Sequence, residues 1–193
     1  MTRVIEVVEY KDEWRRLYED EANRLRPVFG SGLMAVHHIG STSVPGMQAK
    51  PIIDILVELE ETVDITAYFG QMEALGYHCR GECLDAVVPG TPGRFYFSKD
   101  VYGQRYSQVH ACRVGHFQIA ELLALRDFLR AHSPEAAAYG ALKRELARRV
   151  RHDNVAYMRS KDGFIKKLIH RATKWKRAQP DSGDGAGLRS VRF

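Results

Sequence analysis

The sequence predicts a chain of the α+β (α/β) class, in which a small mixed β-sheet carries flanking helices and a C-terminal helical hairpin or bundle. Of the 193 residues, 45% are hydrophobic and 27% charged, which is typical of a globular domain. Helix-spaced and strand-like apolar segments alternate up to about residue 115, and only helical spacing follows, to about residue 177. We therefore expect one domain over residues 1–177, with a core of about 1–115 and C-terminal helices of about 116–177. Residues 178–193, rich in Gly and Ser, are expected to be a disordered tail.

The first elements are a helix, two strands and the loop between the strands. We predict a helix over residues 12–29, a strand over 33–39, a loop over 40–50 and a strand over 51–59. The helix shows apolar residues at helical spacing and is followed by Gly30, a typical stop. The second strand, PIIDILVEL, is almost continuously apolar, which favours an interior position in the sheet. Pro51 stands at its first position, where a missing N–H is tolerated.

The middle of the chain is expected to complete the sheet. We predict a helix over residues 63–75, a short strand around 77–79, a turn or mobile loop over 84–93, and strands over 94–98 and 106–114 joined by a hairpin around 100–103. Gly76 ends the helix, and two Pro-Gly pairs mark the turn. The two later strands are rich in β-branched and aromatic residues.

Three helices are expected to end the fold. They cover residues 117–130, 133 to about 152, and 153 or 154 to about 177. Ser133 is the expected N-cap of the second helix, because Pro134 then occupies its first turn.

The charge is divided unevenly along the chain. Residues 1–125 contain 12 basic and 17 acidic residues, whereas residues 126–177 contain 15 basic and 5 acidic ones. A basic half of this kind either contacts phosphates or nucleic acid, or forms the solvated face of helices. No aromatic residues interleave the charges in a stacking pattern, so the solvated face is the better supported of the two.

Composition also bears on the compartment. The chain contains no long apolar run and begins without a continuous apolar segment, so we expect neither a membrane span nor a secretory signal. Cys79, Cys83 and Cys112 are an odd number without metal-finger spacing. We therefore expect reduced thiols and a cytoplasmic location. The sequence does not indicate an oligomeric state.

The stretch HHIGSTSVPGMQAKPIIDI, residues 37–55, carries the most specific chemistry. Gly40 allows the backbone to approach a phosphate, and the hydroxyls of Ser41 and Thr42 can donate to its oxygens. Asp54 lies in the next strand, where a buried carboxylate is costly unless it meets a cation or several donors. The pattern predicts a phosphate site beside a divalent metal, Mg²⁺ or Mn²⁺, with Zn²⁺ as an alternative. The simpler reading is a tight Gly-Ser turn and an Asp that caps a neighbouring backbone.

The part HIGSTSVPGMQAKPIIDI resembles the GrpB family, a branch of the nucleotidyltransferase superfamily. That superfamily has a Gly-Ser pair after one strand and an acidic pair in the next. LGYHCRGE, PGRFYF, LRDFLRAHSPEAAAYGALKRELA and YMRSKDGFIKKLI also resemble this family, so the resemblance covers roughly residues 4–176. It implies a sheet of nucleotidyltransferase type, and some members of the family are fused to a dephospho-coenzyme A kinase domain.

The chain departs from the superfamily at the second acidic position, which is Leu56. Glu58 shares the strand face of Asp54 but lies ~13 Å further along. The resemblance places His110 on the strand that carries the third carboxylate, as a metal ligand or general base. His38 and Glu82 are further candidate metal ligands. Each histidine has an ordinary structural role as its alternative.

Several cations are candidates for binding phosphate. They are Lys50, just before the Asp54 strand, and Arg94 and Arg105, which flank the hairpin strands. The alternative for each is a surface cation. Lys143, Arg144 and Lys161, in the helical region, are expected to be solvated.

Three functions remain open. The first is transfer of a nucleotidyl group from a nucleoside triphosphate to a small acceptor, with a divalent metal on Asp54 and His110. The second is a catalytically degenerate module that binds a nucleotide or another phosphorylated ligand, which the missing acid favours. The third, and least supported, is nucleic-acid binding through residues 126–177, which predicts a steep salt dependence.

Overall fold

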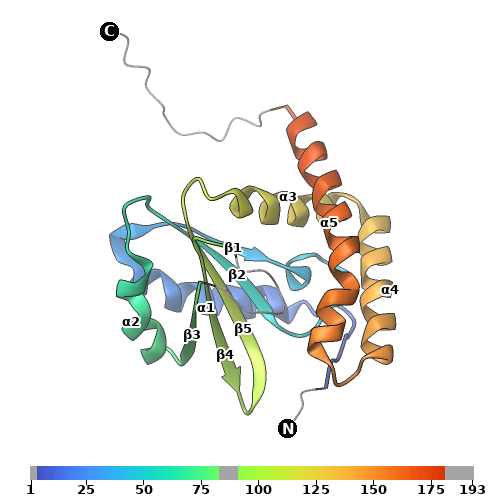
Figure 1. Ribbon diagram of the computed structural model, residues 1–193, viewed down its shortest axis with the longest axis horizontal. Coiled ribbons are helices and arrows are strands. Elements are labelled where there is room, and N and C mark those ends of the chain that lie inside the picture. Colours follow the sequence, from blue (N-terminus) through green and yellow to red (C-terminus); the bar gives the residue numbers. More distant parts are fainter. Residues whose placement is uncertain (1–3, 83–90, 181–193) are drawn as a thin grey trace.

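A computed structural model describes residues 4–82 and 91–180 and shows one five-stranded sheet with helices on both sides (Figure 1). The strands are β1 (Leu33–Ile39), β2 (Ile53–Leu59), β3 (Tyr77–Glu82), β4 (Arg94–Val101) and β5 (Gln104–Arg113). Their order across the sheet is β1-β2-β5-β4-β3. β2 and β5 are parallel, whereas the other neighbours are antiparallel. The expected mixed sheet and α+β class are therefore confirmed.

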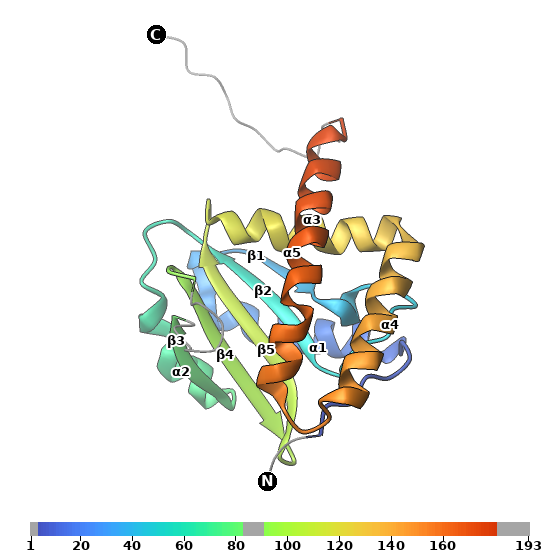
Figure 2. The same cartoon turned by 45° about the vertical axis from the view of Figure 1, so that its right-hand side comes forward.

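The described residues form five α-helices around the sheet (Figures 1 and 2). They are α1 (Glu13–Phe29), α2 (Phe69–Ala74), α3 (Phe117–Ala131), α4 (Ser133–Arg149) and α5 (Asn154–Ala178). Figures 1 and 2 show α3 across one end of the sheet and α4 and α5 side by side next to it. None of the described helices is long and apolar enough to cross a membrane.

The alternation of side chains along the strands separates two faces of the sheet. Ile55, Val57 and Val109 belong to a core that also contains Trp14 and Leu25 of α1. Because neighbouring residues in a strand point to opposite faces, Asp54 and Leu56 face the other side, toward the C-terminal helices. Leu56 packs there in a small buried cluster with Ile39, Cys112 and Ile119 of α3.

Three local expectations need correction. The helix expected over residues 63–75 is a 3₁₀ turn (Ile65–Tyr68) followed by α2, because the Asp64 side chain accepts the N–H of Thr66 and starts a separate turn. Ser133 is the first residue of α4, and His132 holds the N-cap position. The hairpin is tighter than expected, because Tyr102 and Gly103 both adopt positive φ (50° and 75°) and let β4 and β5 extend to Val101 and Gln104. Most of the turn expected over 84–93, and the tail beyond residue 180, lie outside the described residues.

Candidate functional site

Gly40 and Asp54 are in direct contact where the chain leaves β1, and Asp54 lies on the face of the sheet that is turned toward the C-terminal helices. Gly40 has φ +69°, and a Cβ on it would lie 2.3 Å from Asp54 Oδ2. The turn after Gly40 is fixed by Ser43 Oγ, which donates to Gly40 O at 2.6 Å, and by Thr42 Oγ1, which donates to Ile52 O at 3.2 Å. Only glycine therefore allows this turn to approach the carboxylate so closely.

Three lysines from separate parts of the chain lie near enough to Asp54 for their charges to lower its pKa. Lys50 comes from the loop before β2, Lys143 from α4 and Lys161 from α5. Lys50 Nζ and Lys161 Nζ each lie 5.3 Å from the ring centroid of Tyr157. Lys143 is 3% exposed, and its Nζ donates to Gln48 O at 2.5 Å. The expectation that Lys143 and Lys161 are solvated is thus wrong for Lys143 and too simple for the half-buried Lys161.

Burial and neighbouring charges shift the pKa values of Asp54 and of the three lysines. Burial raises the pKa of Asp54 to about 6, although Lys50, Lys161 and Lys143 all act to lower it. Burial, then repulsion from Lys161, lowers the pKa of Lys143 to about 7, and Asp54 opposes that shift. Burial and Lys50 lower the pKa of Lys161 to about 8, again against Asp54. Burial also lowers the pKa of Lys50. One carboxylate is therefore too little negative charge for one buried and two half-buried ammonium groups, and the cluster of Lys50, Lys143 and Lys161 is complementary to an anion.

A cavity of about 560 Å³ adjoins the cluster at Lys50. Its walls include Tyr96, Arg105 and Gln108 from the β4–β5 hairpin, and residues 152–155 from the end of the α4–α5 turn and the start of α5. This volume is in the usual range for small-molecule sites. The cavity is large enough for a small molecule and opens next to Lys50.

Arg105 is already engaged within the hairpin. Its Nε donates to Asp100 Oδ1 at 2.6 Å, and its Nη1 donates to Tyr96 Oη at 2.7 Å. Tyr96 in turn stacks on His110, with ring centroids 5.4 Å apart. Arg105 therefore positions the aromatic wall of the cavity in addition to contributing charge to it.

His38 and Glu82 are not brought to Asp54. His37 bonds Glu58 across the strands at 2.6 Å on the Asp54 face, so His38 points to the opposite face. There it stacks on Tyr18 of α1, with ring centroids 4.6 Å apart. Glu82 lies on β3, the outer strand, ~14 Å across the sheet from β2.

The donor set does not fit a two-metal centre. Residues 4–82 and 91–180 contain no group of three or more His, Cys, Asp or Glu side chains that could hold a metal ion. The second acidic position is Leu56, which is fully buried beneath α3. Asp54 alone could share one Mg²⁺ with the phosphates of a ligand.

Sequence reasoning missed that Lys143 and Lys161 lie near Asp54, although a signal for their burial was present. Lys143 lies four residues after Tyr139 and three before Leu146, within the buried stripe of α4. Lys161 lies four residues after Tyr157. A lysine at a position that should be apolar is a sign of a buried charge with a specific role.

The five-stranded mixed sheet and its flanking helices form a nucleotidyltransferase-like fold. The Cid1 poly(U) polymerase shares the fold with a TM-score of 0.50 and 12% identity, over 74% of this chain and 45% of that one. The family model described as "GrpB protein" matches residues 4–171, and the chain belongs to this family.

Two GrpB relatives illustrate the match. The crystal structure of GrpB from Enterococcus faecalis superimposes with a TM-score of 0.82 and 37% identity, over 89% of this chain and 99% of that one. The UPF0157 protein YqkA of Bacillus subtilis is 38% identical over 177 residues, which are 92% of this chain and 50% of YqkA. This chain thus spans about half the length of YqkA. The resemblance noted from the sequence is confirmed.

Proposed function

We propose that this chain binds a nucleoside triphosphate or a similar polyphosphate-bearing ligand at the lysines near Asp54, beside the cavity that Lys50 lines. Lys50, Lys143 and Lys161 neutralise the phosphates, and the Gly40–Ser41 turn holds one of them. The remainder of the ligand occupies the cavity next to Lys50. The chain acts as a nucleotide-binding member of the nucleotidyltransferase-like class.

The observation that carries this proposal is the convergence of three lysines on one carboxylate. Asp54 is the carboxylate whose charge raises the pKa values of these lysines, and burial has nevertheless lowered the pKa values of all three. A polyphosphate would add the missing negative charge and restore the protonated state of the lysines. Lysine is a common phosphate ligand, because its compact charge is carried on a flexible stem.

Nucleotidyl transfer to a small acceptor is the second candidate function. The nucleotidyltransferase-like fold and the close approach of Gly40 to Asp54 favour it, since group transfer requires the reacting groups to be held in a fixed geometry. A Mg²⁺ held by Asp54 would polarise a phosphoryl oxygen. This chain's own contribution would be to orient the triphosphate with the lysines.

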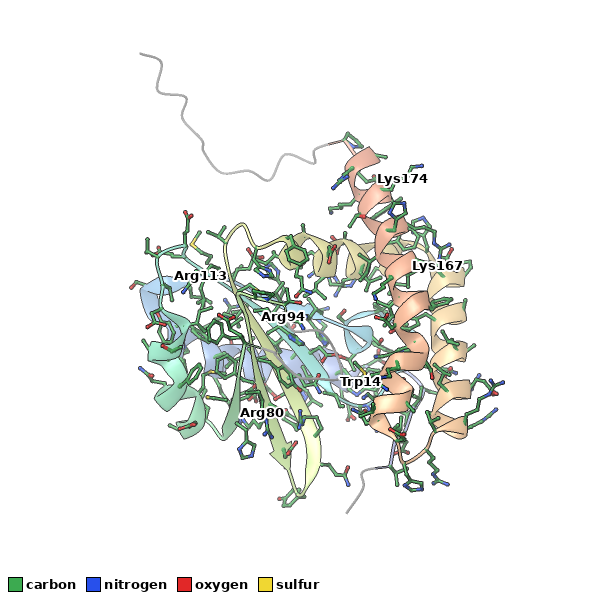
Figure 3. All side chains as sticks on the ribbon, viewed as in Figure 1. Trp14, Arg80, Arg94, Arg113, Lys167 and Lys174 are labelled. Carbon is green, nitrogen blue, oxygen red and sulfur yellow. The ribbon has the colours of Figure 1, made fainter. Side chains whose placement is uncertain are left out.

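Calorimetry with ATP and with inorganic tripolyphosphate tests the first candidate. We would compare the wild type with Lys161→Met and with Lys167→Met, the latter an exposed lysine on the same helix (Figure 3). All measurements are made at about 150 mM salt, which screens nonspecific attraction between surface charges and the anions. Each titration is run first in EDTA and then in Mg²⁺. We expect binding in EDTA that Lys161→Met weakens about tenfold and Lys167→Met leaves unchanged.

Two results would contradict the proposal. One is no binding of either compound, and the other is equal weakening by both variants, which would indicate a general surface effect. Release of pyrophosphate from ATP with Mg²⁺ and candidate acceptors separates the second candidate from simple binding.

A further inference from the structure

Three polar atoms on the same face of the sheet are buried and have no hydrogen-bond partner among the described residues. They are Arg94 Nε, His110 Nδ1 and Gln118 Oε1. Buried polar groups are normally paired, so three such atoms in one region indicate a missing partner. None of them belongs to the cluster formed by Lys50, Lys143 and Lys161.

The register of the strands brings Arg94 and His110 together. His110 lies opposite Tyr96, and Arg94 lies opposite Cys112, the next residue on the same face of β5. Cys112 packs against Leu56, which places all these side chains on the Asp54 face. Burial, and then the nearby charge of Arg94, lowers the pKa of His110 to about 3. Figure 3 shows Arg94 over the middle of the sheet, below α3.

Gln118 closes this region from the first turn of α3. Its Nε2 donates to Thr91 Oγ1 at 3.0 Å, and the backbone N of Arg94 donates to Thr91 O at 3.1 Å. Thr91 thus ties the start of α3 to the start of β4. Ile119, the next residue, packs on Leu56 and Cys112.

We infer that Arg94, His110 and Gln118 form a second binding subsite, which takes the carboxylate of a small molecule carrying a hydroxyl or amino group beside that carboxylate. The Nε edge of Arg94 is suited to a carboxylate, since Arg binds this group through two parallel N–H donors. Neutral His110 donates one ring N–H to the same group. Gln118 Oε1 accepts a hydrogen from the neighbouring hydroxyl or amino group.

Charge separates this subsite from the phosphate site. Arg94 is its one cation, which matches the single negative charge of a carboxylate, whereas the three lysines match a polyphosphate. Two residues along and one strand across from Asp54, His110 lies ~8 Å away from it. In nucleotidyl transfer, the second candidate function, this carboxylate ligand would be the acceptor. Only its role as acceptor rests on the proposed function, because the subsite itself requires no nucleotide.

NMR of protein labelled with ¹⁵N-histidine tests the subsite directly. The probes are glycolate and acetate, titrated at pH 7.5 and constant ionic strength, without nucleotide. We expect the ring nitrogens of His110 to shift with both probes, and glycolate to bind more tightly than acetate because only glycolate reaches Gln118. His110→Gln assigns the signals.

Arg94→Lys and Arg80→Lys are the matched variants. Both keep a positive charge, but Arg80 is exposed and its Nε already donates to Ser98 Oγ at 3.3 Å. We expect Arg94→Lys to weaken the glycolate response about tenfold and Arg80→Lys to leave it unchanged. If Arg94→Lys does not fold, Gln118→Leu carries the test, with glycolate then binding no better than acetate.

An unshifted His110, equal responses to glycolate and acetate, or an equal response in Arg94→Lys would overturn the inference. A His110 response without any binding of tripolyphosphate would leave the subsite standing and remove the proposed polyphosphate function. The two claims therefore fail separately.

Discussion

Replacing Lys143 with Met is expected to make the protein more stable while weakening its binding of polyphosphate. Lys143 is 3% exposed, and its pKa falls from 10.5 to about 7 in the folded chain. At ~1.4 kcal/mol per pKa unit, this shift corresponds to a penalty of about 4 kcal/mol at pH 7. Met removes the charge but also leaves Gln48 O without its donor, which costs ~1–3 kcal/mol. We therefore expect a net gain of about 2 kcal/mol at pH 7.

The pH dependence separates this explanation from a simple gain in packing. The penalty is complete below pH 7, where Lys143 is charged in both the folded and the unfolded chain. It falls as the pH rises from about 7 toward 10.5, because only the unfolded chain then binds the proton. The advantage of Lys143→Met should therefore shrink steadily between these values.

Urea denaturation of both proteins at pH 7, 8.5 and 10 measures this difference. We expect a gain of about 2 kcal/mol at pH 7, which is ~4–8 °C in Tm, that vanishes or reverses by pH 10. A variant that is less stable at pH 7, or a difference that does not depend on pH, would refute the assignment of Lys143 as a buried charge held for a ligand.

Three further predictions concern the region around Asp54. Gly40→Ala should destabilise the fold by ~2–4 kcal/mol in urea titrations, since its Cβ would overlap Asp54. Gly46→Ala is the control, because Gly46 also has positive φ (+74°) but faces open space, and it should lose only ~1 kcal/mol. Equal losses in the two variants would argue against a special approach at Gly40. Leu56→Asp should not restore a metal site but should destabilise the chain by more than ~3 kcal/mol, because the position is closed beneath α3; a stable variant that gains Mg²⁺ affinity in calorimetry would show otherwise. Tripolyphosphate binding at pH 7.5 should take up protons, because the anion raises the lowered pKa values of Lys143 and Lys161. The binding enthalpy measured by calorimetry should therefore vary with the ionisation enthalpy of the buffer. A binding enthalpy that is the same in all buffers would exclude this proton uptake.

The strands were predictable because their apolar patterns are strong and local. The strand expected over residues 33–39 matches β1, and the hairpin strands were found from their aromatic and β-branched residues. The helix expected over residues 63–75 failed because one Asp side chain captures a backbone N–H and starts a 3₁₀ turn there. Such capping competition is weakly encoded in periodicity.

The site was only half predictable. Gly40 directly follows β1, and Asp54 lies in the neighbouring strand β2, so their meeting follows from nearby sequence. Lys143 and Lys161 reach the same carboxylate from helices about a hundred residues away, and only the packing of α4 and α5 decides this. The face on which His38 lies depends on strand register, and the glycine two residues later did not determine it.

The most direct test of the central claim, that lysines rather than a metal on Asp54 hold the phosphates, is the affinity of Asp54→Asn for tripolyphosphate in EDTA at pH 7. Asn keeps the shape of the side chain and removes its negative charge from the centre of the lysine cluster. If the lysines hold the phosphates, the variant should bind about tenfold more tightly than the wild type, because the repulsion between Asp54 and the anion is gone. Weaker binding in the variant, or binding by the wild type only when Mg²⁺ is present, would contradict it.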